Sequence, residues 1–236
     1  MTTSEMLIRA KADFDEVYNA GYEKGKSEGG TDLLQYATFT NGNIFRSAVF
    51  PDEIAENIYF KIQGINNPII VQAVGLSLAF MASNVKNITI EIIGSMEKGV
   101  TFNNVFQACT DLISVTFAND VFYIGNGAST FNGATKLERI NGVMDLSLAG
   151  NISGMFQKCN SLKEVRFAQG SIYKSISFTD SASLSDKSTE NIINGLANLT
   201  GQTSQSLSVH GDVFNRMTAE QKSSIANKNW TLSAVA

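Results

Sequence analysis

The sequence predicts an α/β solenoid in which units of about 25 residues each hold one short strand and one short helix. The first observation is that four kinds of residue recur at steps of 25 positions in the centre of the chain. These columns are Phe106/Phe131/Phe156, Cys109/Ala134/Cys159, Leu112/Leu137/Leu162 and Val115/Ile140/Val165. The second observation is that the end of each unit alternates apolar and polar residues, which is typical of a strand with one buried face.

The first half of each unit predicts a short helical segment behind the strand. An aromatic residue and a small residue lie three positions apart there, which places both on one face of a helical turn. One strand and one short helix per unit is the plan of a leucine-rich-repeat solenoid, so we expect stacked strands about 4.8 Å apart over a continuous core. We assign residues 100–180 to these repeats.

The segment from Met155 to Val165 resembles the BspA-type leucine-rich repeats of bacterial surface proteins. In those repeats an aromatic residue, a cysteine, a Ser-Leu pair and a β-branched residue recur. The segment from Val105 to Val115 is similar, whereas the middle unit has Ala134 in place of the cysteine. The resemblance implies a fold and leaves the ligand open, because such repeats serve many ligands.

Residues 1–30 are predicted to form a helical stem and a Gly-rich linker. Apolar residues fall at heptad spacing between positions 4 and 26, while acidic and basic residues occupy the other faces. The helix either docks on its own protein or a neighbour, or forms an oligomerising stem, with a homotrimer as the expected assembly. The residues expected at that interface are Leu7, Ala10, Phe14 and Val17.

The segment from Phe14 to Lys26 has a second resemblance. It is similar to the leaders of repeat proteins that phages and prophages of Gram-positive bacteria encode. This resemblance implies a protein of the virion or its tail, made in the bacterial cytoplasm. The alternative location is the bacterial cell surface.

Residues 31–99 predict a β-rich N-terminal unit that covers the open end of the stack, because uncovered strand edges would be exposed there. The sequence Asn41-Gly42-Asn43 indicates a hairpin turn. The alternating segments Asn57–Ile62 and Asn87–Ile93 each predict a strand.

Residues 181–236 predict an α/β cap at the other end, after a further strand at Ser171–Phe178. Ser185 or Asp186 could cap one helix, and Thr218 with Gln221 forms a capping box ahead of another. The segments 206–210 and 230–232 predict strands, with the tryptophan at position 230 closing the core.

Composition excludes several classes of partner. The chain has a net charge of −4 and no run of basic residues, which argues against nucleic acid and anionic membranes. No segment reaches the roughly 18 consecutive apolar residues of a membrane span, so we expect no membrane insertion. The start of the chain lacks the basic-then-apolar order of a signal peptide.

Candidate catalytic residues are few. His210 is the single histidine and no Gly-x-Ser-x-Gly motif is present, so we expect no hydrolase triad, no zinc site and no cofactor. Cys109 and Cys159 share a column two units apart, which puts them about 9.6 Å from each other at strand spacing. Because a disulfide needs Cα atoms within about 7 Å, we expect two buried free thiols.

These observations and resemblances together suggest a non-enzymatic recognition or structural protein of a phage virion, in the tail or fibre, that takes part in host attachment. Its partners would be a protein or cell-surface glycan of the bacterial host and other virion proteins. Two alternatives stay open, a bacterial surface or intracellular adhesion-type repeat protein and a glycan-active enzyme. The expected binding face consists of exposed strand positions: Ser114, Thr116, Glu138, Lys163, Glu164 and Arg166.

Overall fold

The computed structural model describes residues 46–63, 79–93, 96 and 99–235. The predicted N-terminal stem, with Leu7, Ala10, Phe14 and Val17, lies outside the described residues. The predicted hairpin at positions 41–43 lies outside them as well. The division of the chain into 1–30, 31–99, 100–180 and 181–236 stays a prediction.

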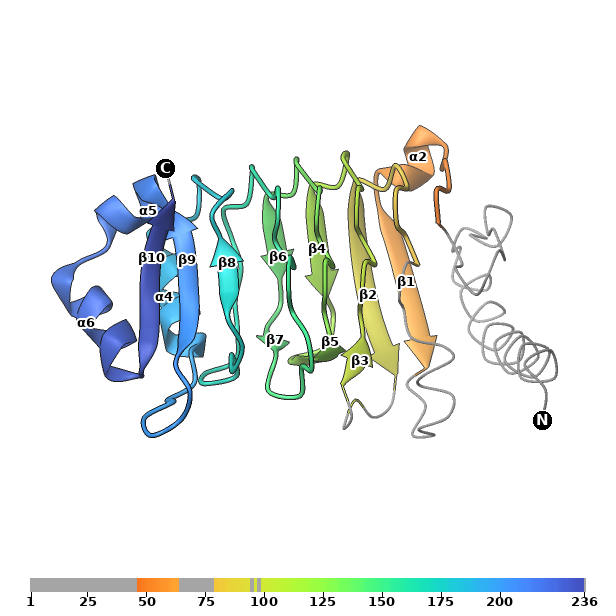
Figure 1. Ribbon diagram of the computed structural model, residues 1–236. Coiled ribbons are helices and arrows are strands. Elements are labelled where there is room, and N and C mark those ends of the chain that lie inside the picture. The colour runs from red at the N-terminus through yellow and green to blue at the C-terminus, as the bar shows by residue number, and fades with distance from the viewer. Residues whose placement is uncertain (1–45, 64–78, 94–95, 97–98, 236) are drawn as a thin grey trace.

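The described strands form three small parallel sheets. Their orders are β1-β2-β4-β6, β3-β5-β7 and β10-β9-β8. Figure 1 shows the strands in a row along the molecule, with the C-terminal helices at one end, and the arrows of the first and last sheets point in opposite directions. The strands are β1 (Ile58–Gln63), β2 (Asn87–Ile93), β3 (Val100–Thr101), β4 (Ser114–Phe117), β5 (Phe122–Asn126), β6 (Arg139–Asn141), β7 (Met144–Asp145), β8 (Ile176–Phe178), β9 (Gln205–His210) and β10 (Trp230–Val235).

The described helices are short and gather mainly at the C-terminal end (Figure 1). They are α2 (Asp52–Ala55), α4 (Asp186–Gly195), α5 (Gly211–Arg216) and α6 (Ala219–Asn227). None of the helices within the described ranges is long and apolar enough to cross a membrane.

The prediction of an α/β leucine-rich-repeat solenoid is wrong. The strands fall into three separate sheets of four, three and three strands, and no residue from Gly99 to Ser185 is helical. The central segments that were expected to form helical turns behind the strands are instead non-helical turns. The fold is therefore better described as short parallel sheets joined by turns, with the short α2 before β1 and the other described helices after residue 185.

Backbone geometry explains why these turns are not helices. Two residues in each turn have positive φ, namely Asn104 and Ala108, Ser129 and Gly133, and Gly154 and Lys158. A right-handed helix needs negative φ throughout and N–H groups that donate four residues back. Here the Phe106 N–H donates to Thr130 O at 2.8 Å, and the Phe131 N–H donates to Met155 O at 2.9 Å. Each turn thus bonds to the next turn, and its internal backbone bonds reach back three residues, as from the Cys109 N–H to Phe106 O at 3.1 Å, instead of the four of an α-helix.

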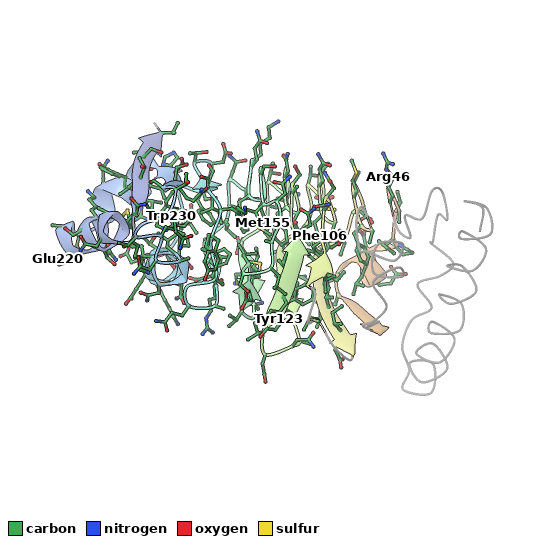
Figure 2. The ribbon with its side chains drawn as sticks, turned by 60° about the horizontal axis from the view of Figure 1, so that its bottom comes forward. Arg46, Phe106, Tyr123, Met155, Glu220 and Trp230 are labelled. Carbon is green, nitrogen blue, oxygen red and sulfur yellow. The ribbon has the colours of Figure 1, made fainter. Side chains whose placement is uncertain are left out.

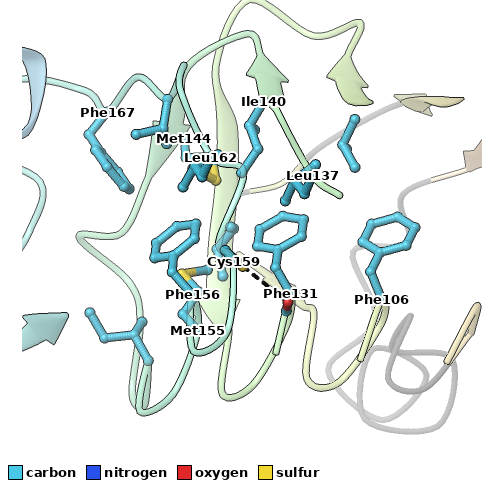
Figure 3. Close-up of a cluster of buried hydrophobic side chains, with 14 of the residues drawn as sticks. Phe106, Phe131, Leu137, Ile140, Met144, Met155, Phe156, Cys159, Leu162 and Phe167 are labelled. Carbon is cyan, nitrogen blue, oxygen red and sulfur yellow. Dashed lines mark hydrogen bonds between the residues drawn. The ribbon is translucent and has the colours of Figure 1, made fainter. Parts of the chain in front are cut away.

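The core is a continuous cluster of buried apolar side chains. Its centre is a row of stacked rings, and Figure 3 shows Phe106, Phe131 and Phe156 of this row. The ring centroids lie 5.8 Å apart for Phe80–Phe106, 5.7 Å for Phe106–Phe131, 5.6 Å for Phe131–Phe156 and 4.8 Å for Phe156–Phe178. Such offset stacks add about 0.5 to 1.5 kcal/mol per pair beyond their burial. The regular spacing in the sequence therefore marks side chains that touch one another.

The C-terminal elements follow local sequence signals. Ser185 is the N-cap of α4, and its hydroxyl accepts from the Ser188 N–H at 3.1 Å. Thr218 and Gln221 form the predicted capping box of α6. Trp230 is buried, and its indole N–H donates to Ala197 O at 2.8 Å. The strand predicted at 171–178 is limited to β8, because the backbone bends at position 174.

Candidate recognition faces

The six predicted binding residues lie on neighbouring segments. Ser114 and Thr116 point outward from β4, while the alternating residues Val115 and Phe117 are buried. Glu138 immediately precedes β6, and β4 pairs with β6. The other three predicted residues lie in segment 163–166, which pairs with β6 through a bridge between Arg139 and Glu164.

We call this surface the polar strand face and define it by selected outward polar residues of β2, β4, β6 and segment 163–166, together with Glu138, which precedes β6. Its members are Asn87, Thr89, Ser114, Thr116, Glu138, Arg139, Asn141, Lys163, Glu164 and Arg166.

Hydrogen bonds between neighbouring segments hold the polar strand face. The Ser114 hydroxyl donates to Asn87 Oδ1 at 2.7 Å. The Asn141 amide donates to Thr116 Oγ1 at 3.0 Å. These exposed contacts add little to stability individually, but together they fix side-chain positions.

The charges of the polar strand face are also engaged. The Lys163 ammonium donates to Glu138 Oε1 at 3.0 Å. The Ser188 hydroxyl at the start of α4 donates to Glu164 Oε2 at 3.2 Å. Both carboxylates that sequence reasoning selected therefore act as acceptors in contacts across segments.

Asn87 and Asn141 were missed by sequence reasoning. Both occupy outward positions in register with predicted residues, since Asn87 pairs with Ser114 and Thr116 pairs with Asn141. The sequence interval between Thr116 and Asn141 is the same as the interval within the apolar columns. Extending those columns to polar positions could have found Asn141.

A second surface lies on the sheet β8-β9-β10. We call it the hydroxyl face and define it by the outward Ser and Thr residues of these strands and the residues that flank them. Its members are Ser175, Ser177, Thr179, Ser204, Ser206, Ser208, Thr231 and Ser233. Sequence reasoning did not select any of them.

The polar strand face and the hydroxyl face continue different parts of the structure. Segment 163–165 is followed in space by α4, because the Val165 N–H donates to Ser188 Oγ at 3.0 Å. The strand β8 instead continues the central turns, since Phe178 stacks on Phe156 and the Ser181 hydroxyl donates to Cys159 O at 3.0 Å. The polar strand face and the hydroxyl face are thus separate surfaces.

His210 has a structural contact. It is the N-cap of α5, and its Nδ1 accepts from the Asp212 N–H at 3.1 Å. The same nitrogen lies 3.5 Å from Asp212 Oδ2. This arrangement explains why a histidine stands at the junction between β9 and α5.

The two cysteines are free and buried, as predicted. The Cys109 thiol donates to Phe80 O at 2.9 Å, and the Cys159 thiol donates to Phe131 O at 3.2 Å (Figure 3). Burial raises the pKa of Cys109 to about 11 and raises the pKa of Cys159 further still. Both groups therefore stay protonated near neutral pH and are poor nucleophiles.

One shallow, open hollow lies beside α6. It is lined by Asn198, Ala219, Glu220, Ser223, Ser224, Asn227 and Lys228. The Lys228 ammonium turns to the end of α4, where it donates to Ile193 O at 2.7 Å and to Leu196 O at 3.0 Å. Figure 2 places Glu220 at the outer tip of this end of the molecule. Across the described part of the chain, no group of three or more His, Cys, Asp or Glu side chains could hold a metal ion.

Comparison of the chain with family models, with curated proteins and with solved structures found no match. The resemblances to BspA-type repeats and to phage-encoded leaders therefore stay predictions.

Proposed function

We propose that the chain is a non-enzymatic recognition protein of a phage particle, in the tail or fibre, and that it takes part in host attachment. The observation that supports recognition best is the polar strand face. Its donors and acceptors are spread over neighbouring strands and are held in place by contacts between those strands.

Preorganisation makes such a surface suitable for binding. A ligand that meets side chains already fixed by Ser114–Asn87 and Asn141–Thr116 contacts loses less side-chain entropy on binding. The buried residues between them, such as Val115 and Ile140, anchor the strands in the core. The face therefore combines a rigid base with exposed polar groups.

The carboxylates favour recognition over glycan hydrolysis. A glycosidase needs one carboxylic acid to donate a proton and a second carboxylate to act as base or nucleophile. Glu138 instead pairs with Lys163, and Glu164 accepts from Ser188. Both carboxylates are partly exposed and already engaged in these contacts, so neither is free to act as the acid or the base.

The proposal of a virion location rests on the leader-like segment from Phe14 to Lys26. The partners would be a protein or glycan on the surface of a Gram-positive host cell, together with other virion proteins. A bacterial adhesion-type protein is the alternative. Mass spectrometry of purified phage particles separates the two, because the alternative expects the chain to be absent from them.

Binding of the full chain to cells and purified cell walls of Gram-positive bacteria tests the recognition proposal. We expect Asn141→Glu to weaken attachment at least tenfold, because it places an extra charge in the polar strand face. Asn132→Glu is a matched control. Like Asn141, Asn132 donates from its amide to a side chain 25 positions away, here Gln157 Oε1 at 3.2 Å, but it lies in a turn outside the polar strand face. Equal attachment of the two variants would contradict the proposed face.

Light scattering tests the expected homotrimer. We expect the full chain to have the mass of a trimer and a chain that begins at Thr31 to have the mass of a monomer. A monomeric full chain would exclude the trimeric stem and leave the helix to dock on its own chain or on another protein.

A further inference from the structure

We propose that Asn141 is a site of spontaneous deamidation, at which an amide of the polar strand face is converted to a carboxylate. The reaction is favoured where glycine follows asparagine, because glycine has no side chain to hinder the backbone nitrogen that attacks the amide. The chain has five Asn-Gly pairs, of which four lie in the described residues. The structure separates the pair Asn141–Gly142 from the other three.

The reaction consumes water and releases ammonia. The Gly142 nitrogen loses its proton and attacks Asn141 Cγ, so that a bond from this nitrogen to Cγ forms and the bond from Cγ to Nδ2 breaks. The amide nitrogen leaves as ammonia and carries one proton away. Water then opens the cyclic imide at one of its two carbonyls. Opening at Cγ gives aspartate, and opening at the main-chain carbonyl gives isoaspartate.

The backbone nitrogen of Gly142 is free to attack. Its N–H donates no hydrogen bond within the described part of the chain, whereas the Met144 N–H donates to Arg166 O at 3.0 Å. Gly142 follows β6 directly and has φ of +95°, so the chain turns out of the ladder at this point. Removing the proton from Gly142 therefore breaks no hydrogen bond within the protein.

The glycines of the other three described pairs are engaged. The Gly127 N–H donates to Asn151 O at 2.9 Å, and the Gly133 N–H donates to Gln157 O at 2.9 Å. Gly195 is buried as the last residue of α4, and the N–H groups of an α-helix bond to carbonyls four residues back. Attack by any of these nitrogens must first break a backbone hydrogen bond.

The side chain of Asn141 is also open to water. It is exposed at the last position of β6, where its Nδ2 donates to Thr116 Oγ1 at 3.0 Å. Water reaches an exposed residue both as the base that takes the proton and as the reactant that opens the imide. By contrast, Asn126 Oδ1 is buried and has no hydrogen-bond partner among the described residues.

Deamidation changes the charge and the contacts of the polar strand face. A carboxylate only accepts hydrogen bonds, so residue 141 can no longer donate to Thr116. The product also adds one negative charge to a chain whose net charge is −4. The effect on binding rests on the proposed function, under which an extra charge at position 141 weakens attachment. The face would then lose its ligand with age.

Peptide mapping by mass spectrometry tests the site in the full chain, stored at pH 8 and 37 °C. Each conversion raises the mass of a peptide by about 1 Da. We expect position 141 to convert at least tenfold faster than positions 126, 132 and 194. In guanidinium chloride that unfolds the chain, we expect the four rates to agree within threefold, because only the Asn-Gly sequence then matters. Equal rates in the folded chain, or faster conversion at another of the four positions, would overturn the inference.

Two variants test the consequence for attachment. Asn141→Gln blocks the reaction, because glutamine must close a larger ring, and Asn132→Gln is the matched control at a pair whose glycine N–H is bonded. Attachment of each stored chain to Gram-positive cells is compared with that of its own fresh sample. We expect the original chain and Asn132→Gln to lose at least fivefold once position 141 is converted, and Asn141→Gln to keep its starting level. Equal losses in all three chains, or no loss on conversion, would overturn this consequence.

The same measurements separate this inference from the proposed function. If the fresh chain binds no Gram-positive cell but position 141 converts first, host attachment is wrong and the modification site stands. If the fresh chain binds cells but position 141 converts no faster than the other positions, recognition stands and the modification site is wrong.

Discussion

The central part of the molecule and its C-terminal end cover their parallel strands in different ways. In the centre, turns with left-handed residues bond to the next turn, and a row of phenylalanine rings fills the space inside. At the C-terminal end, helices α4, α5 and α6 follow the strands and are held by side-chain caps. Parallel pairing therefore requires a buried face, but not a helix in every unit.

The sequence interval between paired strands does not simply follow this division. In the centre, paired residues of β4 and β6 lie 25 positions apart in the sequence, as Val115 and Ile140 do, which is also the spacing of the apolar columns. In the C-terminal sheet, β9 and β10 keep that interval, whereas Ile176 of β8 pairs with Leu207 of β9 across a longer stretch of chain. The helix α4 lies within this longer interval, whereas α5 and α6 both lie within the shorter interval between β9 and β10. Helices can thus be inserted into the chain without changing the parallel order of the strands.

The largest expected effect is on the central aromatic row. Phe131 is fully buried between Phe106 and Phe156, so we expect Phe131→Ala to lower the free energy of unfolding by about 3 to 5 kcal/mol. Urea denaturation measures this loss. The control Val235→Ala changes a side chain that is 48% exposed, and we expect less than about 0.5 kcal/mol from it. A loss below about 1 kcal/mol for Phe131→Ala would mean that the row is not a main source of stability.

The buried thiols of the central part predict that the free energy of unfolding depends on pH. The pKa of Cys109 rises from 9.0 to about 11, so the folded state holds its proton more tightly than the unfolded state. Stability from this group is complete below pH 9 and is lost as the pH rises from 9 towards 11, by about 1 kcal/mol per pH unit. Denaturation at pH 8 and pH 10 measures the change.

The variant Cys109→Ala serves as the control for this pH dependence, because tyrosines and lysines also titrate above pH 9. We expect the drop between pH 8 and pH 10 to be smaller in the variant than in the original chain. An equal drop in both chains would assign the pH dependence to other groups.

The helix caps predict an effect confined to the C-terminal end. Thr218→Ala removes the hydroxyl that accepts from the Gln221 N–H at 3.2 Å. We expect a loss of about 1 kcal/mol in the free energy of unfolding, measured by urea denaturation. Thr218→Ser keeps the cap and should lose much less. If both substitutions cost the same, the methyl group and not the cap stabilises α6.

The smallest expected effect comes from the left-handed turn residues. Ala108 has φ of +60°, which disfavours a residue with a Cβ by about 1 to 2 kcal/mol. We expect Ala108→Gly to stabilise the chain by about 0.5 kcal/mol, because the relief of strain exceeds the entropy that glycine loses on folding. Thermal denaturation should show a higher midpoint. Ala134→Gly is the control, since Ala134 is buried and absent from the positive-φ set, and we expect it to destabilise the chain.

Sequence reasoning found the strands and caps that carry strong local signals. Alternation located β1 and β2, and the hydroxyl residues Ser185 and Thr218 marked the starts of α4 and α6. The columns of equivalent residues also predicted buried cysteines. These features depend on residues close together in sequence or on a constant spacing.

The nature of the central turns was not predictable from the same signals. A phenylalanine and a small residue three positions apart suit one helical turn, but they suit the observed non-helical turn equally well. Positive φ is signalled by glycine at Gly133, whereas Ala108 and Lys158 adopt it without such a signal. Tertiary bonding between turns overrides the local preference of these two residues.

The candidate faces were predictable only in part. Alternation identified Ser114 and Thr116, but their partners Asn87 and Asn141 became clear only from the strand register. The hydroxyl face depends on the side-by-side pairing of three strands that are far apart in the chain. Sequence alternation shows that Ser206 and Ser208 share a face, but it does not show which other strands lie beside them.

The position of Trp230 gives the C-terminal region an optical signal of its own. It is the single tryptophan of the chain, and Figure 2 shows it within the C-terminal end. Its fluorescence therefore reports on the packing around α4, α6 and β10, whereas far-ultraviolet circular dichroism follows the secondary structure of the whole chain. The two signals change at the same urea concentration when the regions unfold as one unit, and at different concentrations when one region unfolds first.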